Sequence, residues 1–414
     1  MRRPLRTATF AALPLCAAGL AGASAASAQA DREPMATVYT FKGRGWGHGV
    51  GMSQYGARGQ ALAGRRAAAI LRHYYRGTRL TTAPTRTVKV LLAEGAARVA
   101  VSSPRRWRAV GAAGGRGHRS VRLAGRAVLT VRAGAGGRTV LLRGSRRVAT
   151  FAGGVRLVPA RRGSVYWGQG SPRADRSYRG ELRAVPSGGG FDLVNAVGLE
   201  DYLKGVVPRE MPPDWGDDAP AALQVQAVAA RSYALATLKP GAVYDLFDDD
   251  RSQTYGGVAS EDPRSSRAVD ATRKRVLTYG GKVITAYFFS TSGGRTENVE
   301  NVFSGSPPRP YLVSVPDPYD RGSPYHASWP DPPSFTGAGL GRALGLDGPV
   351  DRVEILARGV SPRVRSARFT ARSGASAVVT GIQVRSTLGL RDSWFRVIRR
   401  TMPRSQADRL VGGA

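Results

Sequence analysis

The chain has 414 residues, with a formal net charge of +33, 42% hydrophobic residues and a single cysteine. It is long enough to bury a substantial core, in two or three subdomains. The positive charge would attract polyanions, although charge that is spread along a chain is usually solvated surface. The sequence contains no zinc finger, ribonucleoprotein motif or aromatic and basic groove pattern, so we expect no nucleic acid partner.

The first thirty residues have the pattern of a secretory signal. Three arginines lie within the first six residues, an apolar run covers about 8–20, and small residues precede a cleavage site near Ala30. The apolar run is shorter than the roughly 20 residues that a membrane-spanning helix needs. We therefore expect a secreted or cell-envelope protein, with an uncleaved signal anchor as the alternative. Cleavage would also remove Cys16, and with it any disulfide or cysteine nucleophile.

The remaining chain changes character in steps. Residues 31–84 hold a glycine-dense segment and a short helix that ends at Gly77. Residues 85–185 contain short β-branched runs between glycine-rich turns, which predicts a small β-barrel or sandwich subdomain. Helices and strands are mixed over 186–400, and 401–414 would be a C-terminal tail.

The mixed region contains the longest predicted helix. A strand at 191–197 and a helix at 199–207 precede it. We expect Asp217 or Asp218 to cap the longer helix and Pro220 to lie in its first turn, and we expect the helix to end at the Lys-Pro-Gly sequence at 239–241. One face of this helix carries mainly small residues, so another element should pack closely against it: Ala222, Leu223, Val225, Gln226, Ala229, Ala230, Tyr233 and Ala234.

Further strands are predicted at 275–279, 282–291, 352–358, 367–372 and 377–386. Together these elements predict an α+β fold. It would combine a mixed sheet, the small-residue helix beside an active-site cleft, and the β-rich subdomain.

Two segments have a specific pattern. They read GRGWGHGVGMSQYGARGQALAG at 43–64 and LEDYLKGVVPREMPPDWGDDAPAALQVQAVAARSYALA at 199–236, the latter continued by SQTYGG at 252–257 and YFFSTSGGRTE at 287–297. Together they resemble the stage II sporulation protein D / LytB family of exported proteins of the peptidoglycan layer. The resemblance covers most of residues 36–400 and is weakest in the β-rich region.

The resemblance implies enzyme chemistry at one glutamate. Family members studied as enzymes are lytic transglycosylases that cleave glycan strands stripped of stem peptides, and the glutamate of their VVPxEMP motif, here Glu210, is the catalytic acid. Apolar neighbours would raise the pKa of this carboxyl, whereas Arg209 would lower it if its side chain points inward. The alternative is that Glu210 only caps or pairs near a helix start.

The glycine-rich motif supplies further candidates for substrate binding. Trp46 could stack on a sugar, and His48 could bind substrate or orient Glu210. The next polar candidates are Ser53, Gln54 and Tyr55. The alternative is a glycine turn with a satisfied buried histidine. In many relatives this motif lies near the C-terminal end of the domain. We therefore expect the N-terminal arm to pack beside the strands at 380–397.

Four more polar side chains are candidates for binding substrate. Gln226 and Arg231 lie on the small-residue helix, where they would face the cleft or brace the fold. Ser290 and Ser292 lie just before paired glycines, and Thr296 lies just after them. The backbone N–H groups of this turn could hold an acetamido carbonyl, and an inert hairpin is the alternative.

We expect no metal and no cofactor. Some relatives carry a zinc site made by a histidine and two cysteines, but here Phe247, Arg251 and Ser252 occupy those places and none is a soft ligand. The three aspartates at 248–250 could attract calcium weakly, and an acidic loop is the simpler interpretation.

The expected partners are peptidoglycan glycan strands, anionic wall polymers through the basic surface, and a wall amidase. The rival function is a non-catalytic amidase enhancer or glycan-binding modifier of another hydrolase. Other wall enzymes are excluded because the sequence lacks H-E-x-x-H, S-x-x-K and G-x-S-x-G, and because the mature chain would have no cysteine.

Overall fold

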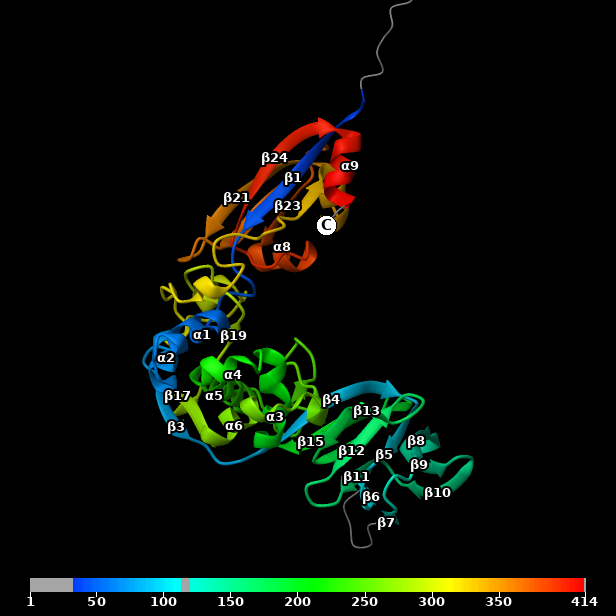
Figure 1. Ribbon diagram of the computed structural model, residues 1–414. Helices are drawn as coiled ribbons and strands as arrows, with labels where there is room; N and C mark the ends of the chain where they lie inside the picture. Colours follow the sequence, from blue (N-terminus) through cyan, green and yellow to red (C-terminus); the bar gives the residue numbers. More distant parts are fainter. Residues whose placement is uncertain (1–32, 113–119, 413–414) are drawn as a thin grey trace, which may run out of the picture.

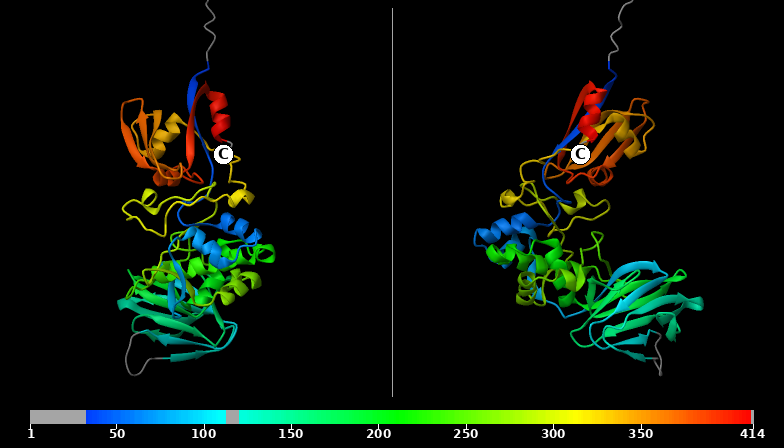
Figure 2. Two further views of the ribbon diagram at one scale, coloured as in Figure 1. Left: turned by 90° about the vertical axis from the view of Figure 1, so that its left-hand side faces the viewer. Right: turned by 45° about the vertical axis from the view of Figure 1, so that its right-hand side comes forward.

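The computed structural model describes residues 33–112 and 120–412. The expected signal, with Cys16 and Ala30, lies outside the described residues. Figure 1 shows a β sandwich at one end, a helical part in the middle and a C-terminal unit at the other end, and the two views of Figure 2 agree. The fold is α+β, as expected. Within the described residues, no helix is both long and apolar enough to cross a bilayer.

The β-rich region is a sandwich rather than a barrel. A seven-stranded sheet has the order β16-β4-β15-β14-β11-β6-β7 and a six-stranded sheet the order β10-β9-β8-β5-β12-β13. β16 joins β4 in parallel, and the other pairs are antiparallel. The strands are β4 (Thr87–Ala96), β5 (Arg98–Ser102), β6 (Trp107–Gly111), β7 (Ser120–Leu123), β8 (Leu129–Gly134), β9 (Arg138–Arg143), β10 (Arg146–Phe151), β11 (Val155–Pro159), β12 (Ser164–Gly168), β13 (Arg173–Arg179), β14 (Glu181–Ser187), β15 (Gly190–Gly198) and β16 (Leu246–Phe247).

The alternating apolar residues of both sheets share one buried core, as expected when two sheets pack face to face. Trp107 and Leu157 enter it from one sheet, and Val131 and Trp167 from the other. The core continues under the helix that follows β15, which carries Tyr202. This continuity fixes that helix on the sandwich.

The helical part is built around one helix of small residues, α5. Ala222, Ala229 and Ala230 are fully buried, which lets α1, α2, α3, α4 and α6 approach closely. The helices are α1 (Gln54–Leu62), α2 (Ala67–Tyr74), α3 (Leu199–Glu210), α4 (Trp215–Asp218), α5 (Pro220–Ala236) and α6 (Pro263–Ala271). Short 3-10 turns occur at Ala135–Gly137, Gly257–Ser260, Val299–Asn301 and Asp320–Gly322.

The expected cap of α5 is wrong. The N-cap is Ala219, without a side-chain hydrogen bond, and Pro220 occupies the first turn as expected. Asp217 and Asp218 belong to the separate short helix α4. Their carboxylates pair with Arg264 and Arg58 instead, at 2.8 and 3.0 Å.

The strand expected over 282–291 is interrupted. It contains only β18 (Lys282–Val283) and β19 (Phe288–Phe289), because each end has a different partner. β18 pairs with β17 (Arg275–Tyr279), which in turn pairs with β3 (Arg79–Thr82), whereas β19 runs parallel to β2 (Met52–Ser53). The segment therefore links a small sheet to the glycine-rich motif.

The C-terminal unit contains two three-stranded sheets and also the N-terminal arm. β1 (Met35–Gly43) is the central strand between β20 (Ser334–Thr336) and β24 (Phe395–Pro403), and both pairs are antiparallel. The prediction that the arm packs beside the strands near 380–397 is confirmed for β24 (Figure 1). The second sheet has the order β21-β22-β23, with β21 (Val350–Arg358), β22 (Val364–Ala371) and β23 (Ser376–Thr380).

Three helices complete this unit: α7 (Gly337–Leu344), α8 (Gly381–Thr387) and α9 (Arg404–Gly412). The strand predicted over 377–386 is wrong in its second half. Thr380 and Gln383 form a capping box, which ends β23 and begins α8.

Candidate functional site

Glu210 is the last residue of α3, and the local sequence explains why the helix ends there. Met211 is extended, with φ −136° and ψ 133°, and Pro212 and Pro213 cannot donate the backbone hydrogen bonds that a further turn would need. The Glu210 side chain turns toward the 252–257 motif, where its Oε1 accepts the backbone N–H of Thr254 at 2.6 Å.

Three motif segments meet at Glu210. The side-chain amide of Gln54, from the glycine-rich motif, donates to the Glu210 carbonyl at 2.8 Å and lies 3.3 Å from Oε1 of Gln226 on α5. Gln226 is fully buried, and its Nε2 atom has no hydrogen-bond partner in the described part of the chain. The structure thus links three of the predicted site residues, because Gln54 bonds both to the Glu210 main chain and to Gln226.

The environment of Glu210 raises the pKa of its carboxyl, in the expected direction. Burial is the main cause and the charge of Asp250 adds to it, whereas the Thr254 hydrogen bond and the charge of Arg209 act in the opposite direction. The partly buried acid therefore keeps its proton to a higher pH than an exposed glutamate does.

Two tyrosines lie within electrostatic range of Glu210. Burial raises the pKa of Tyr202 and of Tyr233, and the Glu210 charge contributes to both increases. The Tyr202 hydroxyl donates to Oε1 of Gln253 at 3.2 Å. The sequence motifs included these residues, but nothing in their spacing distinguished them from core tyrosines.

His48 is half-buried, and its side chain is hydrogen-bonded within its own motif. Its Nδ1 accepts the backbone N–H of Val50 at 3.1 Å, so the ring proton belongs on Nε2. The ring packs among Tyr287, Phe289 and Phe303, with centroid separations of 5.3–5.9 Å. Burial lowers the pKa of His48 to about 3, so the ring is neutral in the physiological range.

Trp46 is 43% exposed and contacts the C-terminal side of the molecule. Its backbone forms a bridge with Thr291, and its ring packs edge-on against Tyr325 at 4.7 Å. Arg391 lies 6.0 Å from the ring centroid. An exposed indole in this position remains available to a sugar, but its contacts are separate from those of Glu210.

The paired glycines after Ser292 do not offer free N–H groups. Gly293 N donates to Asp320 Oδ2 and Gly294 N donates to the Ser292 hydroxyl, so the expected acetamido-binding turn is wrong. Ser292 is itself buried and donates to Asp320 at 2.8 Å. Ser290 is partly exposed, and its carbonyl accepts the backbone N–H of Tyr55 at the start of α1.

Arg231 braces the fold, which is one of its two expected roles. It is fully buried and forms a two-point ion pair with Glu200, at 3.2 and 2.8 Å. It also donates to the carbonyls of Val269 and Arg275, on α6 and β17. These bonds join α5 to three neighbouring elements.

A second buried ion pair, which no sequence motif indicated, supports the glycine-rich motif. Arg363 contacts both carboxyl oxygens of Asp392 at 2.8 Å and donates to the carbonyl of Ser292 at 2.9 Å. Gly49 has φ +85°, and a Cβ there would lie 2.4 Å from the Arg363 Nε. Only glycine allows this approach. The spacing of the glycines indicates that another group approaches the backbone closely, but it does not identify Arg363 as that group.

The positions that hold zinc ligands in some relatives contact one another here. The Phe247 N–H donates to the Ser252 hydroxyl at 3.1 Å, and the Arg251 guanidinium lies 3.8 Å from the Phe247 ring centroid and pairs with Asp249. Across 33–112 and 120–412, no cluster of three or more His, Cys, Asp or Glu side chains is arranged to hold a metal ion.

Comparison with known proteins identifies the family of one part of the chain. Residues 187–279, from β14 to β17, match the family model described as stage II sporulation protein. This part of the chain is a domain of the stage II sporulation protein D / LytB family. The matched domain includes Glu210, Gln226 and Arg231, whereas Gln54 reaches it from outside the match.

The relatives are similar over limited lengths. A stage II sporulation protein D of Bacillus subtilis is 31% identical over 221 residues, which is 49% of this chain and 61% of the relative. An amidase enhancer of Bacillus subtilis is 41% identical over 118 residues, 28% of this chain and 15% of the relative. An uncharacterized protein of Brachyspira hyodysenteriae is 41% identical over 141 residues, 33% of this chain and 37% of the relative. The chain thus spans less than two thirds of each relative, and no solved structure matches it.

Proposed function

We propose that this chain is an exported peptidoglycan-remodelling protein that cleaves glycan strands as a lytic transglycosylase, with Glu210 as acid and then base. The observation that carries the proposal is the placement of Glu210. A carboxyl with a raised pKa lies at a helix end where two motif segments of the matched domain meet the glycine-rich motif from outside it. Such an acid suits the protonation of a glycosidic oxygen near neutral pH.

The proposed reaction uses one carboxyl group twice. Because Oε1 accepts the Thr254 N–H, the proton of the acid form belongs on Oε2. Glu210 gives this proton to the glycosidic oxygen as the bond from the anomeric carbon breaks. The resulting carboxylate takes the proton of the sugar's 6-hydroxyl as that oxygen attacks the anomeric carbon. The products are a 1,6-anhydro end and a new 4-hydroxyl end, no water is consumed, and the acid is regenerated.

Gln54 and Gln226 act in this proposal as positioning residues. Gln54 bonds to the main-chain carbonyl of Glu210, and Gln226 in turn accepts a bond from Gln54. The helix end therefore keeps its place when the carboxyl changes charge.

The test is mass analysis of digested glycan. Purified strands, with and without stem peptides, are incubated with wild-type protein and with Glu210→Gln, which preserves the acceptor for Thr254 but cannot release a proton. We expect 1,6-anhydro ends from the wild type and a loss of about 10²–10⁴-fold in the variant. Glu94→Gln, the same change at an exposed residue of β4, is the matched control and should keep full activity.

The second candidate is a non-catalytic enhancer of a wall amidase, favoured by the relative whose name is amidase enhancer. In this function the basic chain would hold anionic wall polymers or glycan and present them to the amidase. Peptide release from sacculi by an added amidase would then increase with wild type and Glu210→Gln alike. Equal anhydro product from both proteins, or none from the wild type, would exclude Glu210 catalysis.

A further inference from the structure

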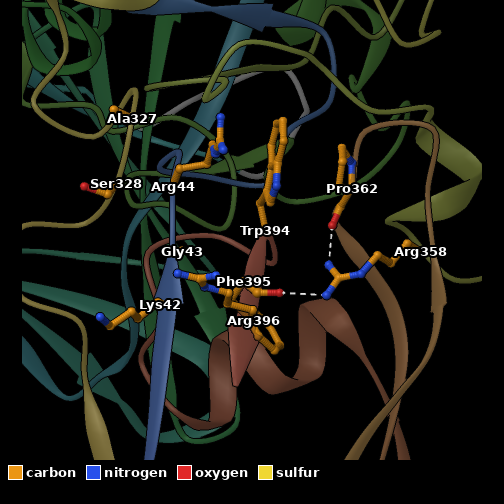
Figure 3. Close-up of a pocket in the computed structure, with 10 residues that line it drawn as sticks. All are labelled: Lys42, Gly43, Arg44, Ala327, Ser328, Arg358, Pro362, Trp394, Phe395 and Arg396. Atoms are coloured by element: carbon orange, nitrogen blue, oxygen red, sulfur yellow. Dashed lines mark hydrogen bonds between the residues drawn. The ribbon is translucent and has the colours of Figure 1, made fainter. Parts of the chain in front are cut away.

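A pocket in the C-terminal unit, separate from Glu210, is lined by positively charged side chains. It has a volume of about 560 Å³ and lies where β1 ends and β24 begins. Figure 3 shows four cationic side chains around it, together with Trp394: Lys42, Arg44, Arg358 and Arg396. No aspartate or glutamate lines the pocket, and none of the four cations forms an ion pair within the described residues.

Two of these cations oppose each other directly. Lys42 on β1 is the register partner of Arg396 on β24, in an antiparallel pair. Directly opposite side chains have Cβ atoms about 5 Å apart on the same face, and like charges in this arrangement destabilise the pair. An anion placed beside both would remove this repulsion. In the free protein Lys42 and Arg396 therefore repel each other, and a bound anion would reduce this repulsion.

The other two cations are held in place. Arg358 donates to the carbonyls of Pro362 and Phe395, at 2.5 and 3.1 Å, as the dashed lines of Figure 3 mark. The Arg44 guanidinium lies 5.0 Å from the centroid of the Trp394 ring. Both side chains are thus ordered before any ligand arrives, which lowers the entropy that binding would cost.

The walls and size of the pocket indicate the rest of the ligand. Trp394, Pro362 and Ala327 supply apolar surface beside the charges, whereas Phe395 contributes its main chain, because its ring is buried against Phe41. The volume is in the range of about 300–1,000 Å³ that suits small organic molecules, and a bare inorganic ion would leave most of it empty.

We propose that this pocket binds an acidic sugar, a sugar ring that carries a carboxylate or a phosphate. The oxyanion lies between Lys42 and Arg396 and also interacts with the anchored guanidinium groups, while the ring lies against Trp394. The proposal is independent of catalysis at Glu210. It would give the protein a second contact with an acidic glycan.

The test uses three probes that share one ring. Glucose 6-phosphate, glucuronate and uncharged glucose are titrated into the protein at low ionic strength and followed by calorimetry. We expect binding of one or both charged sugars, with the stronger identifying the anion, and at least tenfold weaker binding of glucose. Arg396→Gln should weaken the charged probes by about tenfold or more. Arg400→Gln, the same change on the same strand opposite Val38, should not.

A second readout separates a ligand site from a structural role. Without ligand and at low salt, Arg396→Gln should raise the Tm because it removes the repulsion from Lys42, and Lys42→Gln should do the same. Binding of glucose as tight as that of its charged analogues, unchanged binding in both variants, or a lower Tm in both would overturn the proposal.

Discussion

Glu210 is held in a state that favours its neutral form. The pKa of the folded carboxyl is raised mainly by burial, despite the hydrogen bond from Thr254. A folded pKa above the unfolded value means that ionisation costs stability: the wild type loses stability as pH rises from the unfolded pKa, near 4.3, to the raised folded pKa. The burial of this carboxyl therefore costs the fold stability at neutral pH.

Glu210→Gln should therefore stabilise the protein in a pH-dependent manner. Glutamine does not titrate, so the Tm difference between variant and wild type should grow from pH 4 toward pH 8. Thermal unfolding of both proteins over this range measures it. Glu94→Gln should show no such trend, and a Tm difference that shrinks with pH would contradict the assigned direction of the Glu210 shift.

At the residue scale, the sequence predicted some of the side chains around Glu210. Glu210, Gln54 and Gln226 lie in the motifs and do meet. Burial, however, is a property of the assembled fold. The position of Arg231 on α5 could not show that it forms a buried ion pair with Glu200 on α3.

At the scale of the elements, the packing of α5 depends on the buried ion pair between Arg231 and Glu200. Arg231 and Glu200 are both buried, and breaking such a pair leaves one charge without a counterion. Arg231→Met should cost about 3–5 kcal/mol in the free energy of unfolding, measured with denaturant. Arg264→Met, which breaks partly exposed pairs with Asp217 and Asp262, should cost about 1 kcal/mol or less. Equal losses would show that Arg231 does not brace α5 in this way.

The elements also show where local pattern is reliable. The small-residue face of α5 predicts close helix packing reliably, because such packing requires small side chains at many positions along the helix. The run from 377 to 386 is a weak one: its β-branched residues favour a strand, but a single capping box at Thr380 starts α8. The wrongly assigned cap of α5 has a similar cause, since both aspartates belong to a helix too short to be evident from spacing.

At the scale of the whole molecule, β1 joins the N-terminal arm to the C-terminal unit. Phe41 is fully buried between Phe335 and Phe395, with ring centroids 5.7 and 5.3 Å away. The order of the motifs predicted that the arm returns to this region. Its central position between two strands was not predictable, because β20 is only three residues long.

Phe41→Ala should destabilise this unit selectively, by about 3–5 kcal/mol. Amide hydrogen exchange should accelerate in β1, β20 and β24 and remain unchanged in the sandwich. Phe151→Ala, in the sandwich core, should give the opposite pattern. Faster exchange throughout the molecule in both variants would mean that the parts unfold as one cooperative unit.

The central place of β1 also has a consequence for the order of folding. Met35 pairs with Pro403, so the first described strand cannot complete its sheet until β24 has been synthesised. Contacts at such a large sequence separation are slow to form because a very long loop must close first. The sandwich and the helices around α5 can form earlier, and docking of the arm between β20 and β24 should be the last slow step of folding.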